Sequence, residues 1–249
     1  MPTDDLTADE ILDILESGHA QEDPEPGEGL RDRKKRRLRQ RISNVATALF
    51  LAEGFDNVSV TRIAAACEVS EQTVFNYFHT KESMFFDRAD ATAATIAERV
   101  RHRTDEPLGQ VVLSSLLGGM PRRPTAGIEE RHDIGLFRRF CAVADGSPTL
   151  RSAPYLELER FLATVGDALA ERVGADARDP GVRLTAVVLA GLVLVRHQAT
   201  YTHVRTVPSL AALERAVRDD LIRALDLAGP TLAAFDGSAA QHVPAQEQR

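Results

Sequence analysis

Apolar residues recur at three- and four-residue intervals after residue 31, which predicts helices rather than strands. The first apolar face consists of Ile42, Val45, Ala46, Leu49 and Phe50. Gly54 is placed to end this helix, because glycine readily adopts the backbone of a C-cap. Ser59, Ser70 and Thr80 each precede a short run with helical spacing and predict the N-caps of further helices. This order of short helices and tight turns predicts a helix-turn-helix module.

The second and third of these helices each carry a narrow apolar side. Ile63, Ala64 and Cys67 are expected to face the core from the second helix, as are Val74 and Phe78 from the third. The remaining side chains of the third helix are then turned outward or lie at its rim: Glu71, Gln72, Thr73, Asn76 and Tyr77. One side of the third helix is thus predicted to pack and the other to meet a partner.

The rest of the chain also has the pattern of helices, which predicts an all-α fold class. Candidate helices span about residues 110–117, 128–144, 149–173, 181–203 and 209–228. The longest apolar run, 184–195, is too short to span a bilayer and predicts a buried helix. The segment 229–249 is rich in Ala, Gln, Pro and Gly and is expected to be a flexible tail.

Residues 1–30 form an acidic N-terminal extension that is expected to be largely disordered. Within it, residues 7–17 have the spacing of a short amphipathic helix, and Thr7 and Glu10 fit a capping box. Residues 18–30 have the composition of a linker. The predicted domains are therefore the extension, a helix-turn-helix domain over 31–80, a helical domain over 81–228 and the tail.

The net charge of −7 hides a strong segregation of charge. Residues 1–30 hold ten Asp or Glu and no Lys or Arg, whereas residues 31–41 hold eight Lys or Arg and one Asp. Such a basic run is either a solvated face or a clamp for a nucleic-acid backbone. A clamp of this kind contacts phosphates without sequence preference, and its affinity depends on salt concentration. The acidic start either folds back on the basic run and weakens DNA binding, or is a solvating tail.

The outward residues of the third helix have the chemistry of base recognition. Gln72 and Asn76 can contact adenine in bidentate fashion, and Thr73 can donate, accept or touch a thymine methyl. The helix N-terminus favours a phosphate, and Lys81 adds a charge near the same strand. The competing interpretation is a solvated helix face over core aromatics.

Motifs of enzymes and metal sites are missing from the sequence. It contains no G-x-S-x-G, H-E-x-x-H, P-loop, G-x-G-x-x-G or C-x-x-C motif, so neither catalysis nor a cofactor or metal is expected. Cys67 and Cys141 are far apart and imply no disulfide framework, which suits a reducing compartment. The acidic start lacks the features of a signal peptide, and a cytoplasmic location without a membrane partner is expected.

The stretch VTRIAAACEVSEQTVFNYFHTKESMF, residues 60–85, resembles the DNA-binding domain of TetR/AcrR-type transcriptional regulators. That family's pattern is roughly T-x-x-x-I-A-x-x-A-G-V-S-x-x-T-x-Y-x-Y-F-x-x-K-x-x-L. The residues in register with it are Ile63, Ala64, Val69, Ser70, Thr73, Tyr77, Phe78 and Lys81. The resemblance covers about residues 38–90 and implies double-stranded DNA as the partner.

The resemblance also implies roles for individual residues. Thr61 would touch the DNA backbone or a base edge. The side chains that would lie in the groove are Gln72, Thr73 and Asn76. Tyr77 and Lys81 would hold phosphates. The further candidate DNA contacts are Arg36, Arg37, Arg41, Glu71 and His79.

Three positions depart from the family pattern. Phe75 replaces the usual Tyr and lacks its hydroxyl. Glu68 stands where Gly is usual, at a turn that often needs a left-handed backbone. His79 replaces a Pro or variable residue and is either an additional phosphate contact or a loop residue without a role.

For the C-terminal portion the resemblance implies a small-molecule effector and a homodimer, formed through helices near 181–203 and 209–228. The apolar stripe of the second helix serves either the dimer or the core of one protomer: Leu210, Leu213, Val217, Leu221 and Leu225. The candidate effector pocket consists of Phe137, Phe140, Cys141, Phe161 and Val165, with His197, Tyr201, Arg138 or His132 as polar partners. Each of these residues is otherwise explained as core or surface.

The resulting hypothesis is a homodimeric transcriptional regulator of the helix-turn-helix type. It would be a repressor that a small molecule releases from a palindromic operator. A transcriptional activator and an architectural, non-specific DNA-binding protein are the alternatives.

Overall fold

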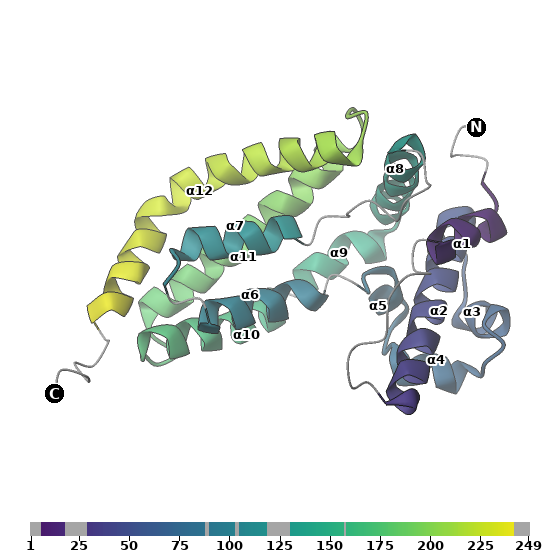
Figure 1. The fold of residues 1–249 in the computed structure, drawn as a ribbon, viewed down its shortest axis with the longest axis horizontal. Coiled ribbons are helices and arrows are strands. Elements are labelled where there is room, and N and C mark those ends of the chain that lie inside the picture. Colours follow the sequence, from purple (N-terminus) through teal and green to yellow (C-terminus); the bar gives the residue numbers. More distant parts are fainter. Residues whose placement is uncertain are drawn as a thin grey trace. The chain divides into compact units, whose positions relative to one another are not determined.

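The computed structural model describes residues 6–17, 29–87, 90–102, 105–118, 130–156 and 158–241, and all regular elements within these ranges are α-helices (Figure 1). The predicted all-α fold class is confirmed. The chain divides into two compact units. The first comprises residues 1–87, 122–153 and 208–210, and the second comprises residues 88–121, 154–207 and 211–249.

Each unit has its own set of helices. The first contains α1 (Ala8–Ser17), α2 (Leu30–Glu53), α3 (Val60–Ala66), α4 (Glu71–Tyr77), α5 (Lys81–Phe85), α8 (Glu130–Gly146) and the start of α9 (Pro148–Leu156). The second contains α6 (Asp90–His102), α7 (Leu108–Gly118), α10 (Leu158–Val173), α11 (Pro180–His203) and nearly all of α12 (Leu210–Gln241). The range 149–173, expected to be one helix, holds both α9 and α10, with residue 157 outside the described part.

The predicted caps fix the short helices of the first unit. Gly54 ends α2 with φ 85°, and its N–H donates to the Phe50 carbonyl. The hydroxyls of Ser59 and Ser70 accept from the third residue after each, as N-caps of α3 and α4. Thr80 forms a reciprocal capping box with Ser83 at the start of α5. Side-chain capping of this kind stabilises a helix by about 1 kcal/mol per cap.

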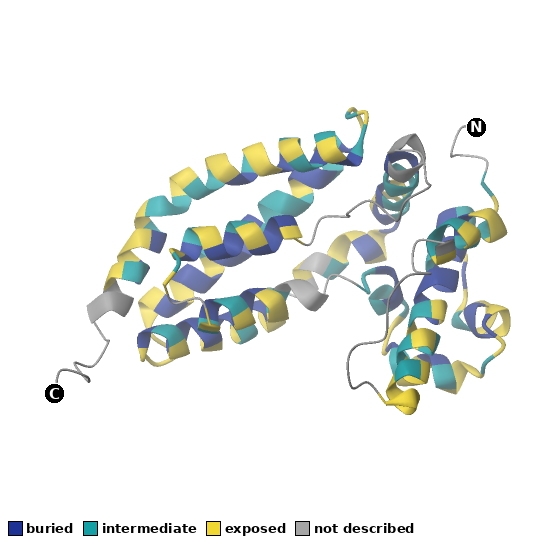
Figure 2. Ribbon diagram, viewed as in Figure 1, coloured by how far each residue is buried: buried dark blue, intermediate teal, exposed yellow. Residues whose placement is uncertain are grey.

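Aromatic rings form the centre of the first unit. Phe85 stacks on Phe140 of α8 with ring centroids 4.2 Å apart, and Phe50 and Phe55 lie 5.0 Å apart. Val74 and Phe78 are buried, as expected, so one side of α4 belongs to the core. The buried sides of these helices face one another, and their exposed sides face outward (Figure 2).

The N-terminal extension contains a docked helix, α1, at the place where residues 7–17 were predicted to be helical. Thr7 and Glu10 form the predicted capping box, with the Thr7 N–H donating to the Glu10 carboxylate at 2.8 Å. Ile11 is fully buried against Ala48 and Leu51 of α2. These apolar contacts hold α1 against α2 despite the acidic composition of the segment. The predicted linker, residues 18–28, lies outside the described residues.

Residue Arg139 of α8 ties α1 and α2 together. Its guanidinium donates to the carbonyls of Leu51 at 2.6 Å and Leu6 at 3.1 Å. The described part of the extension therefore contacts the C-terminal half of α2, whereas the basic run 31–41 occupies the N-terminal half. The fold-back of acidic residues on the basic run remains a prediction.

Helix α12 continues well beyond the point where a flexible tail was expected. It passes through Pro230 to Gln241, with Leu232 and Phe235 buried. The Asp236 carboxylate accepts from the Leu108 N–H at 2.9 Å and pairs with Arg172 of α10. Tertiary contacts thus keep residues 229–241 helical despite their Gly and Pro, and residues 242–249 lie outside the described part.

Helix α11 is long and apolar enough to cross a bilayer, by length and composition alone. Core helices of soluble proteins meet the same criterion. Here Leu189, Ala190 and Leu192 are buried, and α11 packs against α7 and α10.

Candidate nucleic-acid interface and effector region

The exposed side of α4 presents two amides next to each other. Gln72 and Asn76 are both exposed, and the Gln72 Nε2 donates to the Asn76 Oδ1 at 3.2 Å. This bond leaves the Gln72 carbonyl and the Asn76 amide nitrogen for another partner. An acceptor and a donor held side by side match the N6 and N7 edge of adenine. Glu71, Thr61 and His79 are also exposed.

Thr73 has a structural role at the start of α4. It is half-buried, its hydroxyl lies 2.8 Å from the Ser70 hydroxyl, and its N–H donates to the same oxygen at 3.1 Å. The hydroxyl therefore helps to hold the N-terminus of the helix, next to the exposed amides.

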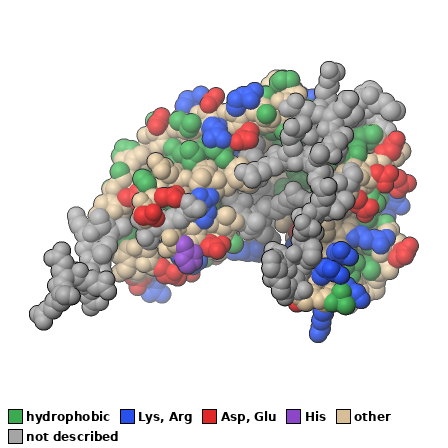
Figure 3. Space-filling view, in the orientation of Figure 1, with side chains coloured by type: hydrophobic (Ala, Val, Ile, Leu, Met, Phe, Trp, Pro, Cys, Tyr) green, Lys and Arg blue, Asp and Glu red, His purple; other side chains and the backbone are tan. Residues whose placement is uncertain are grey.

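A basic groove lies between the first turns of α2 and the end of α4. Its lining consists of Arg31, Asp32, Lys34, Lys35 and Leu38 from α2 and Tyr77 from α4. Lys and Arg side chains gather over this end of α2, at the lower right of the space-filling view (Figure 3). Three cations beside a phenol form a surface that attracts phosphate. Tyr77 is thereby brought together with cations of the basic run.

The cations in this groove are not the arginines that were expected to contact DNA. Arg31, Lys34 and Lys35 precede Ile42 or Val45 by seven or eleven residues, which places them on the same side of α2 as its buried face. Continuing the apolar stripe backwards would have identified them. Arg36 is half-buried, whereas Arg37 and Arg41 are exposed on other sides of the helix.

Two cations near α4 are engaged within the first unit. The Lys81 ammonium donates to the carbonyls of Phe55 at 3.0 Å and Val58 at 3.1 Å, and it lies over the Phe55 ring. Arg39 lies over the Phe78 ring and pairs with Asp87. Lys81 therefore joins α5 to the loop after α2, and its contact with a DNA phosphate stays a prediction.

Two of the departures from the family pattern have structural consequences. Glu68 has φ 57° and, among the described residues, is the one non-glycine with positive φ. The left-handed turn expected at this position is confirmed, and a side chain there costs about 1–2 kcal/mol. Phe75 is 40% exposed on α4, an apolar ring beside the two amides.

The seven residues of the predicted effector pocket do not fall in one unit. Phe137, Phe140 and Cys141 lie on α8, and Phe140 belongs to the aromatic core of the first unit. The others belong to the second unit: Phe161, Val165, His197 and Tyr201. Helical spacing shows that a side of α8 is apolar but not which helix covers it, so the pocket made with the α8 residues stays a prediction. The side chain of His132 lies outside the described residues.

Helix α11 does bring polar and aromatic groups together. The rings of His197 and Tyr201 lie 4.5 Å apart. Arg196 precedes them and is half-buried, and the partial burial of its guanidinium lowers its pKa. Burial, and then the neighbouring charge of Arg196, lowers the pKa of His197 and favours its neutral form. His197 and Tyr201 were among the predicted pocket residues and Arg196 was not, because its lack of a carboxylate partner is visible only in the folded chain.

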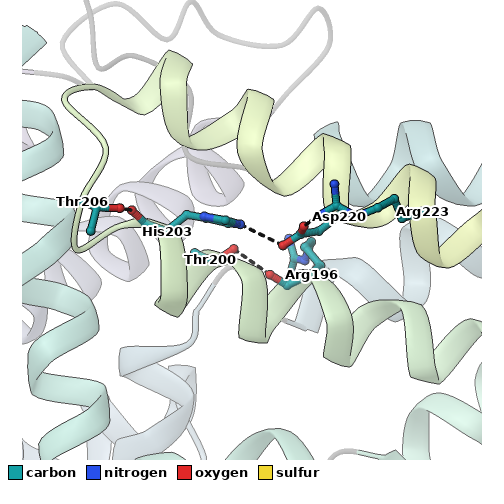
Figure 4. Close-up of polar contacts among 6 residues, drawn as sticks. All are labelled: Arg196, Thr200, His203, Thr206, Asp220 and Arg223. Carbon is teal, nitrogen blue, oxygen red and sulfur yellow. Dashed lines mark hydrogen bonds and ion pairs between the residues drawn. The ribbon is translucent and has the colours of Figure 1, made fainter.

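A hydrogen bond joins α11 to α12 one turn further on. His203 Nε2 lies 2.8 Å from Asp220 Oδ2, and Arg223 also pairs with Asp220 (Figure 4). Thr200 donates its hydroxyl to the Arg196 carbonyl at 2.8 Å. Asp220 is thus shared by two partners, neither of which is Arg196.

Comparisons with known proteins agree with the helix-turn-helix geometry. Residues 42–87 match the family of bacterial regulatory proteins of the tetR type, and residues 126–225 match the MftR C-terminal domain. The HTH-type transcriptional regulator TcmR of Streptomyces glaucescens is 30% identical over 155 residues, 61% of this chain and 68% of TcmR. The chain belongs to the TetR family. A solved TetR-family regulator from Streptomyces coelicolor is 17% identical, with 85% of this chain and 91% of that chain covered and a TM-score of 0.42.

TetR-family membership establishes DNA-binding transcription regulation as the general activity, as the resemblance of residues 60–85 implied. In this TetR-family chain the predicted stripe of α12 is core: Leu210, Leu213, Val217 and Leu221 are buried. On α11, by contrast, Leu184 and Val187 are 56% and 54% exposed.

The described part of this TetR-family chain offers no cluster of three or more His, Cys, Asp or Glu for a metal. Neither Cys67 nor Cys141 forms a disulfide and both are buried, and burial raises the pKa of the Cys67 thiol. A buried thiol with a raised pKa is a poor nucleophile.

Proposed function

We propose that this TetR-family regulator is a homodimeric repressor that binds a palindromic operator and is released from it by a small-molecule effector. The observation that carries the proposal is the exposed amide pair of Gln72 and Asn76 beside the basic groove. The amides have the chemistry of base recognition, and the groove has the chemistry of phosphate binding. An architectural protein needs only the phosphate-binding groove.

The exposed apolar side of α11 supports the dimer. Leu184 and Val187 lie on one side of the helix, and at Gly191 an added Cβ would meet nothing within 4 Å. Exposed apolar surface on a helix favours association with a second copy. A two-fold dimer would present two α4 helices to half-sites about 34–36 Å apart, which is why the operator is proposed to be palindromic.

The dimer is tested by placing a charge on the exposed apolar side of α11. Val187→Asp should yield monomers in sedimentation velocity and lose operator binding, because one half-site supplies too few contacts. Ala163→Asp, at an exposed position of α10, is the matched control and should remain dimeric. Dimers in both variants would exclude this side of α11 as the interface.

DNA binding is tested by fluorescence anisotropy on the intergenic DNA beside the protein's own gene. Excess non-specific competitor and a salt series accompany the titration. Saturable binding that survives the competitor supports a site-specific regulator. Binding that the competitor abolishes on this DNA and on sites selected from random sequence would favour the architectural alternative. A reporter under the operator then separates repressor from activator by the direction of its response.

A further inference from the structure

Arg196 is a cation with a buried guanidinium nitrogen, and no carboxylate in the described part of the chain neutralises its charge. Its Nε is buried and has no hydrogen-bond partner. The hydrogen bond from its Nη1 to the Leu116 carbonyl of α7 is long, at 3.5 Å. Most buried charges in proteins are paired, because burial removes the water that would otherwise solvate them. An unpaired guanidinium inside a folded unit therefore requires an explanation.

Arg172, in the same unit, is a buried arginine whose hydrogen bonds support the fold, and it serves as a comparison for Arg196. Its side chain is 3% exposed. Its Nη2 donates to the Glu106 carbonyl at 2.8 Å and to the Asp236 carboxylate at 3.2 Å. The charge of Arg172 is thus matched by a carboxylate from another helix, and that of Arg196 is not.

The surroundings of Arg196 define the kind of anion that would match it. Leu192, one helical turn before Arg196, is buried, as is Leu116, whose carbonyl Arg196 contacts. The rings of His197 and Tyr201, tilted against each other, follow on α11. Aromatic rings and apolar side chains suit an apolar body, whereas the planar fork of a guanidinium suits a carboxylate in bidentate fashion. His197 favours its neutral form here, so Arg196 is the dominant charge.

We propose that Arg196 binds the carboxylate of an apolar organic acid, and that such an acid is the effector. This inference rests on the proposed function for its biological meaning, but the binding site does not depend on it. The acid would supply the acceptors that Arg196 lacks. Because Arg196 and the exposed Leu184 and Val187 share α11, binding there would act on the helix that carries the proposed dimer interface.

The site is tested by thermal unfolding of the full chain without DNA, with matched acids and alcohols as probes. Octanoate and 2-naphthoate carry the carboxylate, and 1-octanol and 2-naphthol carry the same apolar bodies without it. At a concentration about 100-fold above Kd, a ligand that binds only the native state raises Tm by about 5–10 °C. We expect at least one acid, and neither alcohol, to produce such a shift.

Three variants show whether the shift depends on Arg196. Arg196→Met should abolish it, because the apolar volume stays and the charge is lost. Arg196→Lys should retain part of it, since an ammonium binds a carboxylate less well than the guanidinium fork. Arg183→Met, at an exposed position of the same helix, should leave it unchanged.

The proposal is overturned by an equal shift with the alcohols, by a shift that persists in Arg196→Met, or by no shift with either acid at millimolar concentration. None of these results bears on DNA binding. Failure of operator binding in the anisotropy experiment would instead overturn the proposed function and leave the acid site standing.

Discussion

Arg172 and Arg196 of the second unit each have a buried Nε without a hydrogen-bond partner, but only Arg172 meets a carboxylate among the described residues. The first unit shows the same contrast. The Lys81 ammonium donates to two backbone carbonyls. The Asn76 side chain is exposed, and its amide nitrogen donates to no acceptor in the described part of the chain. The difference suggests a rule for this molecule. Polar groups with partners inside the chain stabilise the fold, and polar groups without them are available for a ligand.

The largest expected effect separates the two arginines. Arg172→Met should lower the free energy of unfolding by about 3–5 kcal/mol, because it leaves the Asp236 carboxylate without its cation. Arg196→Met should not destabilise the protein, and relief from burial of an unpaired charge would stabilise it by about 1–4 kcal/mol. Urea unfolding of both variants measures the difference. Equal losses would contradict the distinction between them.

The same contrast applies to two lysines of the first unit. Lys81→Met should cost about 1.5–3 kcal/mol of stability, the value typical of hydrogen bonds to a charged group. Lys35→Met should leave stability unchanged and instead weaken binding to all DNA sequences, with a salt slope smaller by about 1. Unfolding and salt-dependent anisotropy are measured on both. A reduced salt slope in Lys81→Met with unchanged stability would restore the expected phosphate contact.

On the exposed face of α4, base recognition should appear as a loss confined to one site. Gln72→Ala should weaken binding by about 1–3 kcal/mol at one base position of the operator, and random DNA should be bound as before. Anisotropy on operator variants measures this. Equal losses on operator and random DNA would remove Gln72 from the base-reading residues.

A smaller effect is expected at the strained turn before α4. Glu68→Gly should stabilise the protein by about 1 kcal/mol or less, because glycine adopts the left-handed backbone without strain but loses more entropy on folding. Thermal unfolding gives the stability. Glu68→Ala is the control, since it removes the charge and keeps the strain, and the same gain in both variants would show that charge rather than strain is responsible.

The smallest effect concerns the proton equilibrium of His197. Its lowered pKa means that, as pH falls below about 6.5, the unfolded chain binds a proton that the folded chain does not. The contribution of neutral His197 to the free energy of unfolding is therefore present above that pH and lost below it. Arg196→Met should raise the pKa of His197 and reduce the loss. Histidine NMR titration measures the pKa, and an unchanged value would show that Arg196 has no electrostatic effect there.

The helix-turn-helix was predictable because its signals are local. Ser59, Ser70, Thr80 and Gly54 act within one turn of their own positions, so the sequence locates the helix ends. The left-handed turn at Glu68 was likewise predictable from its place between two helices.

What could not be predicted depends on partners distant in sequence. Leu108 and Asp236 are far apart in the chain, yet their hydrogen bond helps to keep the end of α12 packed. The stacking of Phe85 on Phe140 is one such contact, because spacing alone shows that Phe140 lies on an apolar side but not which ring covers it. Arg196 was missed because its importance lies in the lack of a partner, which only the folded arrangement reveals.

A buried, unmatched arginine is proposed to let an organic acid control DNA binding by this regulator. The most direct test is release of operator DNA, followed by anisotropy, during titration with whichever acid raises Tm. We predict an operator Kd at least about tenfold higher with saturating acid, a coupling of about 1.4 kcal/mol. We also predict that Arg196→Met binds the operator like the original protein and is not released. Release of Arg196→Met at the same acid concentration would contradict this mechanism.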